Sequence, residues 1–187
     1  MILTKADLKQ VLKLERDIYL PKKYFWERML ESENSYKIYQ YVKLLRKTEY
    51  HYNKKSSVIH LLMYAYTRRK KNILGRKLGI EMWENTFDSG LRIEHSGNIV
   101  VNGHSRVGKN CILHGSNCIG NNGKTPESPI LGDNVRIGVG AKIIGGVEIA
   151  SNVTIAAGAV VIESCTIEGA ILAGVPAKVV KVNLVND

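Results

Sequence analysis

Aliphatic side chains recur at every sixth position from Val101 onward, and this period is the strongest pattern in the sequence. A period of six fits neither an α-helix nor one long alternating strand, but it suits a short strand followed by a tight corner. Three such units make one triangular coil, whose inward residues stack on their equivalents in neighbouring coils. The pattern therefore predicts a β-helix with these inward positions: Val101, Val107, Leu113, Ile119, Leu131, Ile137, Ile143, Ile149, Ile155, Val161 and Ile167.

Two interruptions break this period. The first lies between Ile119 and Leu131, where the added residues are rich in asparagine, glycine, proline and serine. Such residues form turns, so we expect a loop that leaves the coil between two strands. The second precedes Val101, because Ile93 and Ile99 are out of phase with the later positions, and His95 lies inside it.

The first ninety residues carry helical patterns instead of the six-residue repeat. Thr4 can cap a helix that ends near Pro21. Further helices are expected near residues 24–31, 36–52 and 57–78. We therefore expect an α+β chain, with a helical N-terminal domain over residues 1–90 and a β-helix domain with a C-terminal tail over residues 91–187.

Charge divides the 187-residue chain in the same way. The net charge is +10, and residues 1–92 contain 20 Lys and Arg against 10 Asp and Glu, whereas the remainder contains 7 against 7. The basic half fits a solvated helical surface, a phosphorylated acceptor or peripheral contact with an anionic membrane. Nucleic acid is disfavoured as a partner, because no aromatic-basic motif or zinc-finger spacing accompanies the charge.

The cysteines and the N-terminus indicate the compartment. Cys111, Cys118 and Cys165 form no C-x-x-C pair, which argues against a disulfide framework or a zinc knuckle. The N-terminus lacks the apolar core of a signal peptide, and no run reaches the ~18 apolar residues of a membrane-spanning helix. We therefore expect a cytoplasmic protein.

Three motifs between Gly90 and Lys181 carry a family resemblance. They are GLRIEHSGNIVV from Gly90, IGVGAKIIG from Ile137 and AGVPAKVVK from Ala173. This half of the chain resembles the serine acetyltransferase branch of the hexapeptide acyltransferases, especially short homologues associated with polysaccharide synthesis. The resemblance implies a left-handed parallel β-helix with one extruded loop, an exception to the usual handedness of parallel crossovers.

Acetyl transfer from a thioester to a hydroxyl needs a base for the hydroxyl proton, and neutral histidine suits this role near pH 7. His95 is the candidate, because its motif resembles the one that carries the family's catalytic histidine. Glu94 is a second catalytic candidate that would orient a partner or bind the acceptor, although adjacent strand residues face opposite sides. His114 is a candidate for the acceptor side. The family acetylates by direct attack, so we expect Cys118 to be structural.

The resemblance also implies acetyl-CoA as co-substrate, bound along the β-helix between neighbouring subunits of a homotrimer, and no metal. A backbone N–H near Gly120 would stabilise the oxyanion. Lys178 and Lys181 would meet CoA phosphates, or else belong to a solvated tail. The cofactor-binding positions carried over from the family are Gly120, Val139, Ala157, Ile162, Lys178 and Lys181.

The chain departs from the family in its extruded loop. The family carries a second histidine just before a proline in this loop, and here Ser128 precedes Pro129. The missing imidazole weakens the case for serine as acceptor, although Ser128 keeps the substrate-side position. We therefore expect a sugar hydroxyl, in capsule or other polysaccharide synthesis, as the acceptor.

Other functions stay open at this point. The first alternative is a serine O-acetyltransferase in cysteine biosynthesis, although the C-terminus lacks the terminal isoleucine often used to dock a partner synthase. The second is a noncatalytic β-helix scaffold. A zinc hydratase would need three histidine ligands, which are not evident among His95, His104 and His114.

Overall fold

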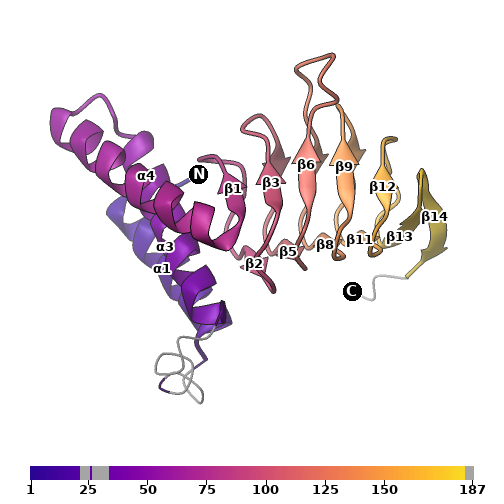
Figure 1. Ribbon diagram of the computed structural model, residues 1–187, viewed down its shortest axis with the longest axis horizontal. Coiled ribbons are helices and arrows are strands. Elements are labelled where there is room, and N and C mark those ends of the chain that lie inside the picture. The colour runs from indigo at the N-terminus through magenta and orange to yellow at the C-terminus, as the bar shows by residue number, and fades with distance from the viewer. Residues whose placement is uncertain (22–25, 27–33, 184–187) are drawn as a thin grey trace.

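The computed structural model describes residues 1–21, 26 and 34–183. Its helices are α1 (Lys5–Tyr19), α3 (Asn34–Tyr52) and α4 (Val58–Leu78). They pack together at one end of a long column of short strands, as Figure 1 shows. The helix expected near residues 24–31 lies outside the described residues, apart from Trp26. None of the described helices combines the length and the apolar character needed to cross a bilayer.

Local sequence signals set the ends of α1 and α4. The Thr4 hydroxyl accepts a hydrogen bond from the Asp7 N–H (3.0 Å), and the Asp7 carboxylate accepts one from the Thr4 N–H (2.8 Å). This reciprocal capping box satisfies two amides at the start of α1, as expected from Thr4. The C-terminal end of α4 is capped by Gly79, whose φ of 67° is in the left-handed region that glycine adopts without steric cost.

The strands form three sheets, which we name A, B and C, and all neighbours pair in parallel except the last two strands of sheet C. Sheet A contains β1 (Ile80–Met82), β3 (Ile99–Val101), β6 (Cys118–Gly120), β9 (Lys142–Ile144) and β12 (Val160–Val161). Sheet B contains β4 (Arg106–Val107), β7 (Ile130–Leu131) and β10 (Glu148–Ile149). Sheet C contains β2 (Arg92–Ile93), β5 (Ile112–Leu113), β8 (Arg136–Ile137), β11 (Thr154–Ile155), β13 (Ala170–Gly174) and the antiparallel β14 (Ala177–Val182).

The predicted aliphatic stack fills the interior of the column. Val101, Ile119 and Ile143 lie in register across sheet A, and all three are buried. Burial of such a side chain contributes roughly 1.5–3 kcal/mol, and the stack repeats this gain in every coil. The six-residue period therefore predicts the β-helix correctly. The loop expected in the first interruption is also confirmed, since residues 121–129 leave the column between β6 and β7 (Figure 1).

The column differs from the predicted pattern at both ends. Its first strand begins at Ile80 and pairs with Ile99, earlier than the start expected at residue 91. The helical pattern conceals this coil, because its strand follows α4 directly. At the other end, Ile167 is 49% exposed, so its predicted inward position is wrong. Cys165 takes the place beside Ile149 instead, because the chain leaves the six-residue spacing in the last coil.

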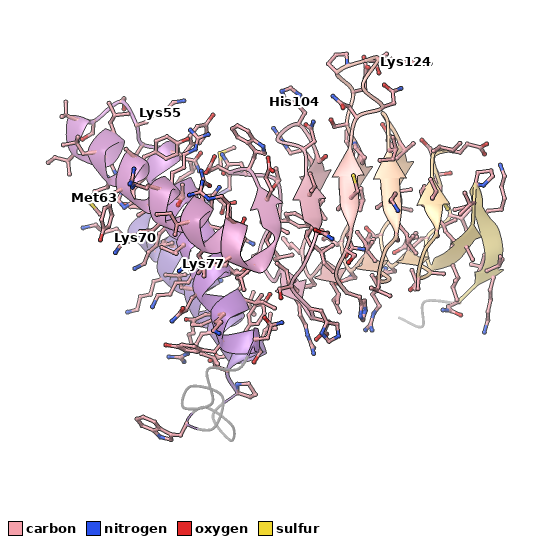
Figure 2. The ribbon with its side chains drawn as sticks, viewed as in Figure 1. Lys55, Met63, Lys70, Lys77, His104 and Lys124 are labelled. Atoms are coloured by element: carbon pink, nitrogen blue, oxygen red, sulfur yellow. The ribbon has the colours of Figure 1, made fainter. Side chains whose placement is uncertain are left out.

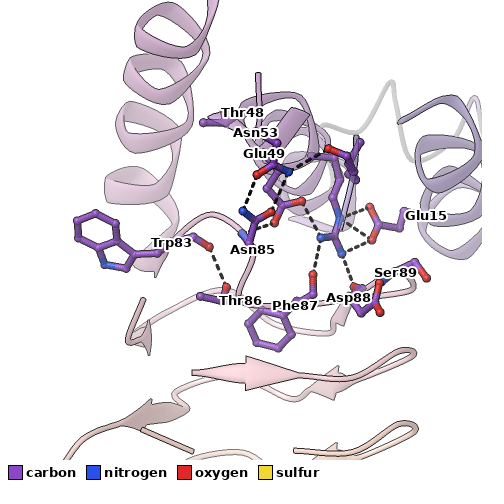
Figure 3. A network of polar contacts seen from close by, with 12 residues as sticks. Glu15, Thr48, Glu49, Asn53, Trp83, Asn85, Thr86, Phe87, Asp88 and Ser89 are labelled. Atoms are coloured by element: carbon purple, nitrogen blue, oxygen red, sulfur yellow. Dashed lines mark hydrogen bonds and ion pairs between the residues drawn. The ribbon is translucent and has the colours of Figure 1, made fainter. Parts of the chain in front are cut away.

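A buried ion network joins the helices to the first coil (Figure 3). The Arg46 guanidinium lies 2.7 Å from the Glu15 carboxylate and 2.9 Å from the Glu49 carboxylate. It also donates to the carbonyls of Phe87 (2.8 Å) and Asp88 (2.6 Å). A buried charge is tolerated only when it is paired and hydrogen-bonded, so this network fixes α1 and α3 against the chain that leads into β2.

Candidate functional site at a corner of the β-helix

His95 lies at the corner between sheets C and A, in the turn from β2 to β3, and its side chain is exposed. Gly97 (φ 108°) and Asn98 (φ 48°) adopt the left-handed conformations that produce the turn. Gly115 of the next coil lies against His95, because a Cβ at residue 115 would be 3.3 Å from the His95 Cβ. The imidazole therefore lies on an exposed corner, and the residue beside it in the next coil is a glycine without a side chain.

The C-terminal end of α4 fixes the second part of this turn, which leads into β3. The Leu78 carbonyl accepts a hydrogen bond from the Gly97 N–H (2.8 Å), and the Gly79 carbonyl accepts one from the Ile99 N–H (2.8 Å). These carbonyls have no partner within a helix, so the corner satisfies them. The position of His95 therefore depends on α4 as well as on the coil itself.

The helix α1 and the start of α3 fix strand β2 and the first part of the turn, through residues that the sequence did not mark as functional. The Tyr19 hydroxyl accepts a hydrogen bond from the Ile93 N–H (2.6 Å). Burial raises the pKa of Tyr19 far above its ordinary value, so the hydroxyl stays protonated. The Ser96 hydroxyl donates to the Asn34 side chain (3.0 Å). No local signal marks these pairs, because 74 residues separate Tyr19 from Ile93 and 62 separate Asn34 from Ser96.

Glu94 and His114 lie at the same corner. Glu94 Oε1 is 2.7 Å from Arg92 Nε in a partly exposed ion pair, so its carboxylate is engaged with Arg92. Ile93 pairs with Leu113, so the half-buried His114 lies beside Glu94 in the next coil. The structure thus brings the predicted residues Glu94, His95 and His114 to one corner of the column.

Two of the predicted cofactor residues continue along this corner. Val139 and Ala157 are both exposed on the coils beyond His114. The adjoining Gly138 has no room for a side chain, because a Cβ there would be 2.5 Å from the Ala157 nitrogen. The buried Asn117 side chain donates to the Gly138 carbonyl (2.7 Å) and fixes this part of the backbone. The coils therefore pack closely on one another at this corner.

Other predicted residues lie on the side of sheet A that leads to sheet B. Gly120 ends β6, and a Cβ at this position would be 3.5 Å from the Asn102 Cβ. Ser128 is buried, and its hydroxyl donates to Asn102 Oδ1 (3.3 Å). Ile162 directly follows β12, which pairs with β9 of the same sheet, and its side chain is exposed. Within one chain, sheet A separates Gly120, Ser128 and Ile162 from His95.

The two predicted lysines lie on the last strand, β14. Lys178 Nζ is 2.7 Å from Glu163 Oε2, so a surface ion pair already holds this side chain. Lys181 is exposed and pairs in register with Ile171. Both lysines are at the opposite end of the column from the helices.

Three cavities are formed elsewhere on the chain, and His95 lines none of them. The first has a volume of about 430 Å³ and lies between α4 and β1, beside Arg68, Arg76 and Trp83. The second, of about 640 Å³, lies between α1 and the first coils. The third, of about 520 Å³, is next to His104. The corner that carries His95 is thus distinct from these three hollows.

Burial argues against a chemical role for Cys111. Cys111, Cys118 and Cys165 are free thiols, and burial raises the pKa of Cys111 well above its ordinary value. A buried, protonated thiol is a poor nucleophile. Among the described residues, no three His, Cys, Asp or Glu side chains are arranged to hold a metal ion.

Comparisons with known proteins agree on one class. Residues 128–163 match the family model described as "Bacterial transferase hexapeptide (six repeats)". A serine acetyltransferase of Staphylococcus xylosus is 31% identical over 133 residues, which cover 65% of this chain and 61% of that protein. The chain is therefore similar to serine acetyltransferases, and it contains a hexapeptide-repeat region.

Solved structures show that the similarity in fold extends through the helices of this chain. The serine acetyltransferase of Brucella abortus strain S19 in complex with coenzyme A has a TM-score of 0.73 and 22% identity, covering 94% of this chain and 68% of that one. The Neisseria gonorrhoeae enzyme in complex with serine has a TM-score of 0.71 and 21% identity, covering 93% and 69%. The expected left-handed β-helix is therefore the fold. The chain spans about three fifths of the length of the curated relatives it matches.

Proposed function

We propose that this chain is an acetyl-CoA-dependent O-acetyltransferase in which His95 is the general base. The observation that carries the proposal is an exposed histidine held between α1 and α4, in a chain similar to serine acetyltransferases. The acceptor oxygen attacks the thioester carbonyl while its proton passes to His95. The carbon–sulfur bond then breaks, and the proton passes from His95 to the departing CoA sulfur.

The split of the predicted residues between two sides of sheet A supports a site shared by two copies of the chain. Val139 and Ala157 accompany His95, whereas Gly120, Ser128 and Ile162 lie across sheet A. A second copy can bring its own Gly120 side against the His95 corner of the first. We therefore propose a homotrimer in which acetyl-CoA lies between neighbouring subunits. A similar protein from Brucella abortus has been solved in complex with coenzyme A, which supports the co-substrate. Lys178 and Lys181 would meet the phosphates once Glu163 releases Lys178.

Serine is the better-supported acceptor. The relatives reported above are serine acetyltransferases, and none supports the sugar acceptor expected from the sequence. The Arg92–Glu94 ion pair beside His95 also offers one charge of each sign, which suits the carboxylate and ammonium of a free amino acid. His114 lies next to this pair and would contact the same acceptor.

Ser128 is the specific observation that keeps a sugar acceptor as the second candidate. Its hydroxyl is engaged with Asn102 and the Pro126 carbonyl, so this position supplies no imidazole and no free hydroxyl. An acceptor that needs a second histidine from the loop would bind poorly. A sugar hydroxyl that relies on Glu94 and His114 would not be affected.

The test measures CoA release from acetyl-CoA in the presence of L-serine. We expect saturable release that falls roughly 10²–10⁴-fold in His95→Ala, because a positioned base contributes that much. His104→Ala is the matched control, since His104 is an exposed histidine outside this corner, beside the third cavity. Equal activity in the parent and His95→Ala would overturn the proposed base. Release with a sugar acceptor but not with serine would support the second candidate.

A further inference from the structure

One side of α4 exposes an unusual number of large apolar side chains. The helix packs against α3 and β1 through the opposite side, where Thr67, Lys71, Gly75 and Leu78 are buried. The exposed side carries Ile59 (73% exposed), Leu62 (66%) and Tyr66 (53%). We name this side the α4 outer face and define it by Val58, Ile59, Leu62, Met63, Tyr66, Arg69, Lys70, Ile73, Arg76 and Lys77.

The same segment carries positive charge without acidic residues. Residues 50–80 contain eight Lys and Arg and no Asp or Glu. Lys71 is buried and paired with Glu84, but within the described chain no carboxylate pairs with the other seven. They are Lys54, Lys55, Arg68, Arg69, Lys70, Arg76 and Lys77.

The apolar and basic residues are ordered along the helix. The apolar residues from Val58 to Tyr66 form the first part of the α4 outer face. Lys54 and Lys55 precede this part, and Arg69 and Lys70 follow it. Figure 2 shows Lys55, Met63, Lys70 and Lys77 in succession along this end of the molecule, opposite the C-terminal strands.

We propose that the α4 outer face binds the surface of an anionic lipid bilayer. Apolar side chains on an interfacial helix enter the boundary between headgroups and acyl chains, while Lys and Arg extend to the anionic headgroups. The α4 outer face offers both components at once. Because its side chains are already exposed, binding requires no rearrangement of the helices.

Charge argues against a second copy of the same face as the occupant. A symmetric contact would place each basic cluster against another, and like charges in contact disfavour association. An anionic bilayer has the complementary charge and also accepts aliphatic side chains. The proposal does not depend on acetyl transfer, so its test can fail while the proposed activity stands, and the reverse.

The test is cosedimentation of the full chain with vesicles. We expect binding to vesicles of phosphatidylcholine with about one third phosphatidylglycerol, weak binding to pure phosphatidylcholine, and a decrease as salt screens the charges. Leu62→Ser should weaken binding about tenfold, because it removes one buried aliphatic side chain. Lys70→Gln should weaken it about fivefold.

Matched controls lie on the β-helix. Ile130→Ser and Lys109→Gln change exposed residues of the same kinds and should leave vesicle binding unchanged. Binding that is equal for neutral and anionic vesicles, or that the controls reduce as much as Leu62→Ser, would overturn the proposal. A smaller oligomeric mass for Leu62→Ser in solution would show that a second copy covers the face. Binding to duplex DNA without binding to anionic vesicles would identify nucleic acid as the partner instead.

Discussion

The helices and the β-helix are stabilised in opposite ways. Every coil of the β-helix buries the same kind of aliphatic residue on the same kind of neighbour, as Ile119 and Ile143 do in sheet A. The helices also bury apolar residues such as Leu45, but they add contacts that occur only once, and the clearest is the Arg46 network with Glu15 and Glu49. Repetition distributes stability over many equivalent positions, whereas a single buried network concentrates it in one.

This difference also bears on the proposed active site. His95 belongs to the β-helix by its strand, yet its turn is fixed by Tyr19 of α1 and by the last carbonyls of α4. The repeated part therefore supplies the scaffold, and the non-repeated part sets the position of the histidine. Variants in each part should have different consequences, and the largest is expected in the ion network.

Arg46→Met should cause the largest loss of stability. Removing the guanidinium leaves the buried carboxylates of Glu15 and Glu49 without their cation, which costs about 3–5 kcal/mol in the free energy of unfolding. Urea denaturation followed by far-UV circular dichroism measures this loss.

The exposed pair of Arg16 and Asp17 provides the control for Arg46→Met. Arg16→Met should change the free energy of unfolding by less than about 0.5 kcal/mol, because surface ion pairs contribute little. If the two variants lost equal stability, the helices would not depend on the buried network. A triple variant with Glu15→Gln, Arg46→Met and Glu49→Gln should recover part of the loss, since it buries no unpaired charge.

Ile143→Ala should have the next largest effect. Ile143 is fully buried between its equivalents in the neighbouring coils, so its truncation leaves a cavity that costs about 2–5 kcal/mol. Differential scanning calorimetry checks the loss. Ile130→Ala, at a position that is 52% exposed, should stay within about 0.5 kcal/mol of the parent. A similar loss for both variants would contradict the stacked interior.

The sequence predicts the repeated part far better than the rest, for a physical reason. An inward position such as Ile137 is marked by its period, because every coil repeats the same steric requirement. The prediction fails where the spacing changes, at the first coil from Ile80 and at Ile167 in the last one. The Thr4 cap was also predictable, since its signal is local. The Arg46 network and the Tyr19 contact are not, because distant segments meet only in the fold.

The candidate site shows the same division. The motif names Glu94 and His95 as candidates, His114 is a separate candidate, and the structure has all three at one corner. The separation of Gly120 and Ser128 from that corner was not predicted, since sequence order does not reveal which side of a triangular coil a residue occupies. The register between coils decides which side a residue occupies, and only the pairing of strands in the three sheets gives that register.

Tyr19→Phe should have a smaller effect on stability and a specific effect on the corner. The variant keeps the ring but removes the acceptor for the Ile93 N–H, which costs about 1–3 kcal/mol for an unsatisfied buried amide. Hydrogen exchange should show faster opening at Ile93 than in the parent. Tyr66→Phe, on an exposed tyrosine, should leave that exchange rate unchanged. Unchanged exchange at Ile93 in Tyr19→Phe would show that α1 does not fix this strand.

The smallest expected effect is a pH dependence at the turn between α3 and α4. His51 Nδ1 lies 2.9 Å from His60 Nδ1, and burial and the neighbouring His60 lower the pKa of His51 below its ordinary value of 6.5. The folded chain therefore favours neutral His51, and stability should fall as pH drops through 6.5 toward the lowered pKa. One ring must accept the hydrogen bond, so protonation of both rings removes it. Melting temperatures between pH 8 and 5 should decline less in His51→Gln than in the parent. Identical profiles in the two chains would show that the charge of His51 does not affect the stability of this turn.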